Sequence, residues 1–435
     1  MRTPLLLALL YGAMTITAQA QCPVPGSDGA LTLAANSGTV IFDPVALSIG
    51  DANNVFCFTS VNIGDSTTLV FYANKMRNPN SPVFFYVQGA FTLGGSSVLN
   101  LRGESSALEF TFPAINSGVS LQQQLQLRRP AIPGPGGFPG GLGQSGGVGA
   151  EAGGGPGGGQ PGLVAGDSTC YGGSAAHFTA AFDPYSLGTQ VSTTTYANVN
   201  LLPMYGGSGG GGGGGTSSSD FGGPGGAGGG AIRIVAASFS FSSGAQIVAN
   251  GGAAYQITPQ MKCAGGAGSA GSIHLVSAAP IPSLAKVLLD VSSRQGDNPS
   301  APTVGGGGLI RISTGDTACN CNGSVVFGPP FTPPLQTGTP SLRIVSIGGQ
   351  SVPAQAGGSY LSPDVVLNTS SAVSIQIASS NIPVGTVVKL RITNEAQADQ
   401  TISCTPLAGS LASATASCSA TYAQLGSMSS VRATW

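Results

Sequence analysis

Residues 61–71 read VNIGDSTTLVF, and residues 91–101 read FTLGGSSVLNL. The two stretches lie 30 residues apart and carry apolar residues, a glycine and a serine at matching positions. A third copy, FSFSSGAQIVANG, occupies residues 239–251. Short strands of period two, joined by glycine and serine turns, cannot bury their apolar faces unless successive copies stack. The repeats therefore predict a parallel β-solenoid, or β-helix.

The third copy also predicts which side chains line the interior of this solenoid. Alternate residues of a strand point to opposite faces. We expect one inner row and one outer row, with Phe239, Phe241, Ile247 and Ala249 inside and Ser238, Ser240 and Ser242 outside. An outer hydroxyl row could face ice or crystalline polysaccharide, but no Thr-x-Thr array recurs in every copy. An ordinary solvated face is therefore favoured.

A further strand pattern leads into the third copy. Residues 232–235, IRIV, fall where residues 84–87 precede the second copy, and SIHLV at 272–276 and LIRIS at 309–313 repeat them. In the last copy we expect Cys319-Asn-Cys321 at the place of residues 239–241, and residues 325–327 at the place of 247–249.

Three polar side chains interrupt these leading strands at equivalent positions. Alternation puts Arg233, His274 and Arg311 on the outward face, which we expect to be exposed to solvent. The arginines then act as surface charge or contact a sugar acid, and the histidine has an incidental role.

The glycine-rich segment 134–230 separates matching solenoid copies. It holds 36 of the 70 glycines and has no lysine or arginine. Such composition is common in flexible linkers. Glycine runs such as 209–215 can also form threefold extended helices of the polyproline II kind, which pack closely because they lack side chains. Both alternatives remain open for this segment.

The pattern changes after the proline pairs at 329–334. From residue 341 onward, six or seven alternating strands with glycine and proline turns suit an immunoglobulin-like β-sandwich. The predicted fold is all-β. Its divisions are a signal peptide at 1–20, solenoid turns at 21–133, the glycine-rich insertion at 134–230, further solenoid turns at 231–328, a proline-rich linker at 329–340 and the sandwich at 341–435.

The first residues predict export. Arg2, an apolar stretch at 5–16 and the Ala18-Gln19-Ala20 triplet match a secretory signal peptide and its cleavage site. No later segment has the length of about 20 apolar residues that a membrane span needs. We therefore expect a secreted or cell-surface protein without a membrane span.

Eight cysteines agree with an oxidising compartment. Cys404 and Cys418 lie in neighbouring strand-like runs, and a bridge between them, closing a loop of 14 residues, would not be the long-range inter-sheet bridge of antibody domains. Order along the chain alone suggests the further pairs Cys22 with Cys57 and Cys170 with Cys263. The expected disulfide-forming residues are Cys22, Cys57, Cys170, Cys263, Cys319, Cys321, Cys404 and Cys418. Cys319 and Cys321 lack the spacing of a zinc site, so disulfides are favoured over metal.

Composition excludes several classes of protein. Charged residues are 7% of the chain, against roughly 25% in average soluble domains. The formal net charge is −1 and the 15 lysines and arginines are scattered, which disfavours nucleic-acid binding. Four glutamates are too few for coiled coils. With 41% hydrophobic residues the chain can bury a core, so highly charged disorder is excluded as well.

Motifs for catalysis or cofactor binding are sparse. Residues 223–228 fit G-x-G-x-x-G, but a strand follows them where a dinucleotide site needs a helix. His177 has Asp167 and Asp183 nearby in sequence, without a serine elbow. Glu104 and Glu109 are the one close pair of glutamates, as a glycosidase would need. They are five residues apart, however, so on one straight strand their side chains would point to opposite faces. We expect no cofactor, no metal and no catalytic residue.

The glycine run, then GGGAIRIV at 228–235 and ANGG at 249–252, resembles the glycine-rich repeats of large secreted bacterial β-helix and adhesin-type proteins. The resemblance covers residues 55–330. It implies a surface-exposed or released protein. Few proteins of this kind have an assigned activity, so the resemblance says little about catalysis or binding.

The function expected is that of a secreted or cell-surface structural or adhesion protein without enzymatic activity, with the sandwich as its contact module. The alternative is an extracellular polysaccharide-binding or polysaccharide-cleaving β-helix protein. Its expected partners are an extracellular polysaccharide or a surface protein. A subunit of a larger assembly would expose an apolar patch or an open sheet edge.

Overall fold

The computed structural model describes most of the chain after the predicted signal peptide. The described residues are 22, 24–105, 130–144, 149–163, 168–182, 191–215, 221–254, 261–292, 304–329, 341–353, 363–369, 371–380, 382, 384–394, 400–410, 413–421 and 429–434. The predicted signal peptide at 1–20 lies outside them, as does all of the predicted linker except residue 329. No helix in these ranges is long and apolar enough to span a membrane.

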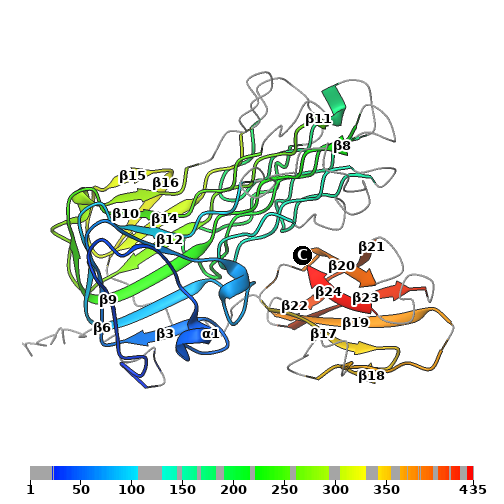
Figure 1. The fold of residues 1–435 in the computed structure, drawn as a ribbon, viewed down its shortest axis with the longest axis horizontal. Helices are drawn as coiled ribbons and strands as arrows, with labels where there is room; N and C mark the ends of the chain where they lie inside the picture. The colour runs from blue at the N-terminus through cyan, green and yellow to red at the C-terminus, as the bar shows by residue number, and fades with distance from the viewer. Residues whose placement is uncertain are drawn as a thin grey trace, which may run out of the picture.

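The regular secondary structure of the described residues is almost entirely β, with parallel and antiparallel sheets (Figure 1). The first parallel sheet contains, in spatial order, β1 (Ala30–Leu33), β4 (Ser60–Ile63), β6 (Val83–Leu93), β9 (Ala231–Phe241), β12 (Ser272–Val276), β14 (Leu309–Ser313) and β16 (Ser324–Gly328), and β3 (Val55–Phe58) also pairs with β6. The second contains β15 (Asn320–Asn322), β13 (Leu288–Asp290), β10 (Gln246–Val248), β7 (Val98–Asn100), β5 (Thr67–Val70) and β2 (Gly38–Ile41). We call the two sheets together the parallel stack.

Strand pairing in the parallel stack follows the sequence repeats. Val61 pairs with Phe91, and Phe91 pairs with Phe239. In the second sheet Leu69 pairs with Leu99, and Leu99 pairs with Ile247. The copies aligned in the sequence are therefore neighbours in space.

Two details of the predicted alignment are wrong. Phe84 pairs with Arg233 and not with Ile232, because β6 has one extra residue between Val87 and Ala90. That bulge shifts the first half of β6 by one residue relative to β9.

The second error concerns the last copy. Cys321 pairs with Leu289 in the second sheet, and Val325 pairs with Ile310 in the first, so each lies in the sheet opposite to the one expected. Only Gly323, with a φ of +123°, separates β15 from β16. Strands of both sheets alternate with the same period, so their sequence pattern does not distinguish them.

The core of the parallel stack lies between its two sheets. Phe239, Phe241, Ile247 and Ala249 are buried in it, as predicted. Ser238, Ser240 and Ser242 are exposed, also as predicted. At the N-terminal end five phenylalanines pack ring against ring, at centroid separations from 4.9 to 6.1 Å; they are Phe42, Phe56, Phe58, Phe71 and Phe85.

The described parts of the glycine-rich segments are hydrogen-bonded to one another through their backbones. Successive amides of residues 209–214 donate hydrogen bonds to three neighbouring segments in turn, and the same order then repeats. The three segments are 151–154, 223–226 and 170–173. The carbonyls of the same run accept hydrogen bonds, also in turn, from the amides of residues 159–162, of residues 141–144 and of Gly266. Each neighbour returns after three residues, which is the period of the polyproline II helix. We call this assembly the glycine bundle.

The glycine bundle includes more than the predicted insertion. Gly266, which leads toward β12, donates to Gly211, and Gly306, which leads toward β14, donates to Ala175. The glycine runs before β9, β12 and β14 thus connect the bundle directly to the parallel stack (Figure 1). A short sheet of β8 (Phe221–Gly222) and β11 (Met261–Cys263) lies at its far end.

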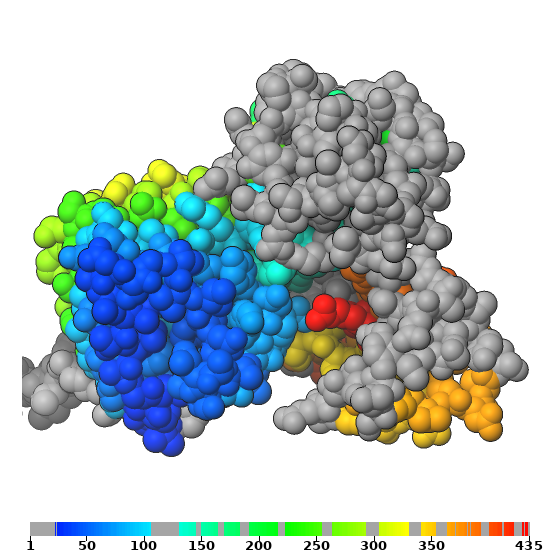
Figure 2. Space-filling view, in the orientation of Figure 1, coloured from blue at the N-terminus to red at the C-terminus, as the bar shows by residue number. Residues whose placement is uncertain are grey.

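The C-terminal strands form two antiparallel sheets. One contains β18 (Gln350–Ser351), β17 (Ser341–Ile347), β19 (Val373–Ser380), β23 (Ser413–Ala420) and β22 (Ala408–Ser410), and the other contains β21 (Gln400–Pro406), β20 (Val387–Asn394) and β24 (Ser429–Thr434). Side chains of both sheets share one buried cluster, to which Phe138 of the glycine bundle also belongs. Figure 2 shows this C-terminal unit, in yellow to red, beside the N-terminal strands in blue.

Among the residues that the structure describes, helical structure is confined to short turns. They are α1 (Pro44–Leu47) and the 3₁₀ turns η2 (Ala73–Lys75), η4 (Ser168–Cys170) and η5 (Leu284–Lys286).

Candidate functional site: a covered arginine and histidine row

Neighbouring strands of the first sheet place three polar side chains in one row. Arg233 of β9 pairs with His274 of β12, and His274 pairs with Arg311 of β14. Phe84 of β6 and Val326 of β16 continue the row on either side. Because paired residues of a parallel sheet point to the same face, the row lies on the face opposite the core.

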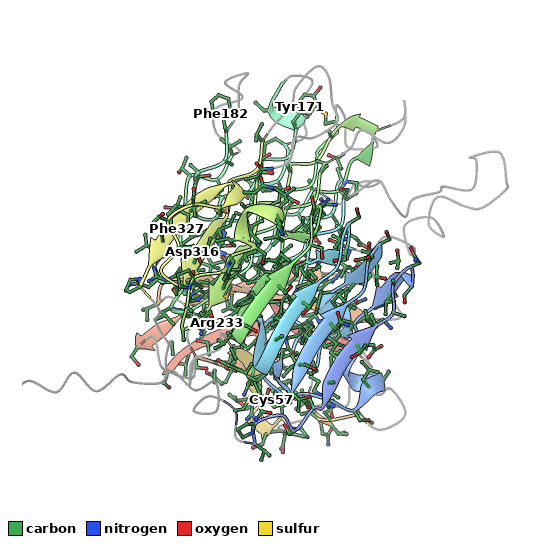
Figure 3. All side chains as sticks on the ribbon, turned by 90° about the vertical axis from the view of Figure 1, so that its left-hand side faces the viewer. Cys57, Tyr171, Phe182, Arg233, Asp316 and Phe327 are labelled. Carbon is green, nitrogen blue, oxygen red and sulfur yellow. A yellow bond between two sulfur atoms is a disulfide. The ribbon has the colours of Figure 1, made fainter. Side chains whose placement is uncertain are left out.

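The row is buried, so the prediction of a solvent-exposed face is wrong. Arg233 and His274 are 0% exposed and Arg311 is 9% exposed. The segment 198–205, which we call the cover segment, lies over this face and contributes Leu201 and Met204 to a second apolar cluster. Figure 3 shows Arg233 within the parallel stack.

One sequence signal could have revealed the covered face. Residues 55–58 and 83–87 are continuous apolar runs, VFCF and VFFYV, without alternation. Strands buried on both faces have this pattern. The structure accordingly buries both Phe85 on the core face and Phe84 on the covered face.

Hydrogen bonds link the row to the cover segment. Arg233 donates from Nε to His274 Nδ1 at 3.1 Å and from Nη2 to the Leu201 carbonyl at 3.1 Å. Arg311 Nη1 donates to the Val199 carbonyl at 2.8 Å. The cover segment is also braced internally, since Asn198 Nδ2 donates to the Leu202 carbonyl at 2.6 Å.

These contacts assign the tautomer of His274. An arginine Nε can only donate, so His274 Nδ1 must accept and carries no proton. The proton of the neutral ring is then on Nε2, which donates to Ser313 Oγ at 3.0 Å. Burial, together with the charges of Arg233 and Arg311, lowers the pKa of His274 well below its usual value, so the ring is neutral.

The positive charges of the row have no carboxylate partner among the described residues. No acidic oxygen in that part of the chain lies within 4.0 Å of either guanidinium. Tyr86 does not supply a negative charge either, because burial raises the pKa of its phenol despite the opposing effect of Arg233. The Phe84 ring lies 5.5 Å from the Arg233 guanidinium carbon, a cation–π contact.

Two N–H groups of the row have no protein acceptor. They are Arg233 Nη1 and Arg311 Nε, both buried. Both ring nitrogens of His274 are engaged in hydrogen bonds, so the row is not arranged as an acid–base pair.

His177 lies apart from this row, inside the glycine bundle. Its ring is 0% exposed and its centroid is 4.8 Å from that of Tyr196. Burial lowers the pKa of His177 to about 3, and the neighbouring Ala270 backbone opposes this shift only in part. Asp167 and Asp183 lie outside the described residues. The surroundings of His177 are those of a packed core residue.

Glu104 holds two chain segments together. Its Oε2 accepts from the Ile132 amide at 2.8 Å, and its own amide donates to the Ile132 carbonyl at 2.9 Å. Glu109 lies outside the described residues, so the structure does not describe the carboxylate pair.

The amides of the G-x-G-x-x-G stretch are already used. Gly225 and Gly228 donate to the carbonyls of Gly141 and Phe138 within the glycine bundle. β9 follows the stretch directly. A phosphate would have to displace these backbone hydrogen bonds, so the stretch is not a phosphate loop.

A polar row occupies the exposed part of the first sheet. Thr32, Asn62, Thr92 and Ser240 are paired in succession across β1, β4, β6 and β9. Three of them are exposed and Thr92 is partly exposed. Successive strands are about 4.8 Å apart, so the row presents hydroxyl and amide groups at a regular spacing.

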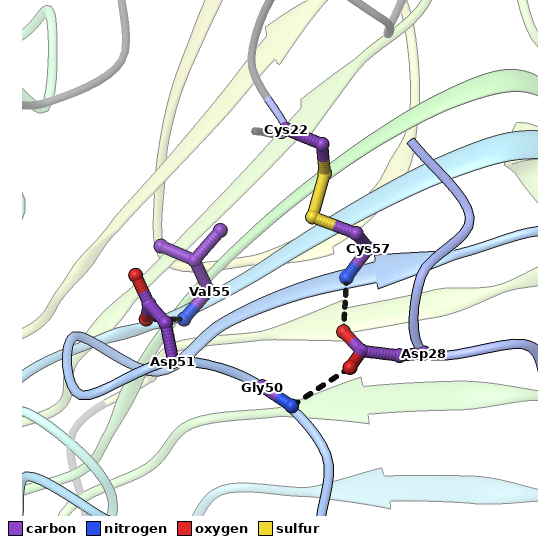
Figure 4. The surroundings of a disulfide bond; sticks show 6 residues. All are labelled: Cys22, Asp28, Gly50, Asp51, Val55 and Cys57. Carbon is purple, nitrogen blue, oxygen red and sulfur yellow. Dashed lines mark hydrogen bonds between the residues drawn. A yellow bond between two sulfur atoms is a disulfide. The ribbon is translucent and has the colours of Figure 1, made fainter. Parts of the chain in front are cut away.

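Four disulfides join the cysteines in sequential pairs: Cys22–Cys57, Cys170–Cys263, Cys319–Cys321 and Cys404–Cys418. Figure 4 shows the first, where Asp28 accepts hydrogen bonds from the amides of Cys57 and Gly50. Cys404 is in β21 and Cys418 is in β23, so that bridge does connect the two C-terminal sheets despite its short loop.

Within the described ranges, no group of three or more His, Cys, Asp or Glu side chains is arranged to hold a metal ion. Comparison with protein-family models, with curated proteins and with solved structures gives no match to this chain.

Proposed function

We propose that this protein is a secreted or cell-surface structural or adhesive protein without enzymatic activity. In this proposal the parallel stack is a β-solenoid and the C-terminal unit is an immunoglobulin-like sandwich that makes contacts. The observation that carries it is the continuity of the parallel stack with the glycine bundle, through the runs that lead into β9, β12 and β14. Backbone hydrogen bonds hold both parts, which supports a stiff scaffold.

The four disulfides support the extracellular part of the proposal. Disulfides persist in oxidising compartments and are rare in the reducing cytosol. The small number of charges and the ordered glycine segments suit a protein whose role is mechanical.

A sedimentation assay with insoluble polysaccharides and cell-wall material tests this function. We expect the purified chain to leave the supernatant with at least one such material, and no soluble sugar to appear. Sugar release that is abolished by Glu104→Gln would contradict the absence of catalysis. A chain that is not depleted by any surface would contradict adhesion.

The exposed polar row favours a second candidate, polysaccharide binding. Regularly spaced Asn62 and Thr92 side chains can bond to the hydroxyls of an extended sugar chain. Replacing both with valine should reduce the bound fraction severalfold. Thr39→Val, at an exposed site on β2 of the other sheet, serves as the matched control and should leave binding unchanged.

A further inference from the structure

One disulfide differs from the other three in how far its cysteines are buried. The six cysteines of the other bridges are buried, with at most 7% of their surface exposed; they are Cys22, Cys57, Cys170, Cys263, Cys404 and Cys418. Cys319 and Cys321 are only partly buried and pack against the core of the parallel stack. β15, to which Cys321 belongs, is the terminal strand of the second sheet and pairs with β13 alone among the described strands. A thiol in solution can therefore approach this bridge more easily than the other three.

The Cys319–Cys321 bridge also contributes least to holding the fold together. Its cysteines are 2 positions apart in the sequence, whereas those of the other bridges are 14, 35 and 93 positions apart. A disulfide restricts the unfolded chain less when it closes a shorter loop. Both cysteines lie at the start of one strand, so the bridge connects no two separate elements. Reduction should therefore leave the parallel stack folded.

The chain at this bridge is shorter than a straight strand. In an extended strand, Cα atoms two residues apart are separated by about 6.6 Å. The Cα atoms of Cys319 and Cys321 are 5.4 Å apart. Opening the bridge would allow the start of β15 to extend, which favours the reduced form. Strained or exposed disulfides are in general the labile or regulatory ones.

We propose that Cys319–Cys321 is a redox-active disulfide that exchanges with small thiols of the cysteine or glutathione class. The thiolate of one such molecule attacks a sulfur of the bridge, so that a mixed disulfide forms and the other cysteine leaves as a thiolate. The thiolate of a second molecule attacks the mixed disulfide at the sulfur of the small molecule and releases the first cysteine. The two cysteines take up the two protons that the small thiols lost, and the small thiols end as one oxidised disulfide. The site thus accepts two electrons, independently of the structural or adhesive role proposed above.

Timed labelling of the folded, unmodified chain tests this proposal. The protein is incubated with reduced glutathione, free thiols are blocked with N-ethylmaleimide, and digested peptides are analysed by mass spectrometry without further reduction. Because exchange rates depend on access to the bridge, Cys319 and Cys321 should acquire maleimide or glutathione roughly tenfold faster than the buried cysteines, or more. Circular dichroism should show a folded chain throughout, and oxidised glutathione should restore the bridge. Labelling no faster than that of Cys404 and Cys418, or only after the chain unfolds, would overturn the proposal.

Two double variants separate a reactive bridge from a structural one. Cys319→Ser combined with Cys321→Ser should remove the fast labelling and leave the midpoint of thermal unfolding nearly unchanged. Cys404→Ser combined with Cys418→Ser is the matched control and should lower the midpoint, because that bridge connects two sheets. If the first variant lost as much stability as the control, the Cys319–Cys321 bridge would be structural and the proposal would be wrong.

Discussion

His177 and His274 are the two histidines of the chain, and both rings are fully buried. His177 is surrounded by the glycine bundle, and His274 lies between two arginines. Neither ring can take up a proton without placing a charge in a medium that does not stabilise it. In the unfolded chain both titrate near pH 6.5.

The pH dependence of stability follows from this difference. The folded-state pKa values of both histidines are lowered, so the unfolded state binds more protons below pH 6.5 and stability falls as the pH falls. For His177 the loss continues down to about pH 3. Between pH 7.5 and 5 each histidine should lower the free energy of unfolding by about 2 kcal/mol.

Urea unfolding at several pH values measures this effect. His177→Phe keeps a ring beside Tyr196 and should remove about half of the loss. An unchanged pH profile in this variant would show that His177 is not buried in its neutral form.

The outward direction of Arg233, His274 and Arg311 followed from alternation alone, but their burial did not. Burial depends on the cover segment, which comes from a stretch that the sequence identifies only as glycine-rich. The unalternating runs at 55–58 and 83–87 were the available signal for it. Local period identifies the face of a strand, whereas tertiary contacts decide what covers that face.

At the scale of elements, the glycine bundle depends on close approach between backbones. A Cβ atom at Gly210 would collide with the Gly266 carbonyl oxygen, and one at Gly211 with that of Gln160. These neighbours are backbone atoms held by their own hydrogen bonds, so they cannot move aside singly.

Gly210→Ala should therefore destabilise the protein by about 1–3 kcal/mol, the usual range for overpacking, or more if the bundle cannot relax. Gly149→Ala is the matched control, because a Cβ there meets nothing within 4 Å. Thermal unfolding of both variants compares them. Equal midpoints would mean that residues 206–215 do not pack as a bundle.

The sequence predicted the pairing of the repeated strands but not the structure of the glycine run. Pairing of the copies at 61–71, 91–101 and 239–251 followed from their internal similarity. The fate of the glycine run did not, because the same composition suits a linker or a packed helix, and the decision depends on distant partners such as 151–154 and 170–173. Cys321 of β15, which lies in the sheet opposite to the one expected, shows that strands with equal periods cannot be assigned to one sheet or the other from sequence.

At the scale of the whole molecule, the C-terminal unit contacts the glycine bundle through Phe138. This side chain is 3% exposed and belongs to the cluster shared by the two antiparallel sheets. Nearby, Thr401 Oγ1 lies 3.4 Å from Glu151 Oε1, and burial lowers the pKa of Lys389 while Glu151 opposes the change. Phe138 is therefore an apolar contact between the C-terminal unit and the glycine bundle, and polar side chains lie near it.

Phe138→Ala should weaken this contact by about 3 kcal/mol or more, the usual loss for a buried phenylalanine. The C-terminal unit would then unfold at a lower temperature than the rest of the chain. Calorimetry detects this as a separate early transition. Phe182→Ala, at a side chain that is 63% exposed, is the control (Figure 3). An identical trace for both variants would exclude Phe138 as an anchor.

The central claim is that the glycine bundle is as ordered as the parallel stack and continuous with it. Hydrogen exchange followed by mass spectrometry tests this claim most directly, since backbone amides carry the whole bundle. The amides of residues 209–214 should exchange as slowly as those of β9 and β12. Exchange of residues 209–214 within seconds, at the rate of an unstructured linker, would contradict the account.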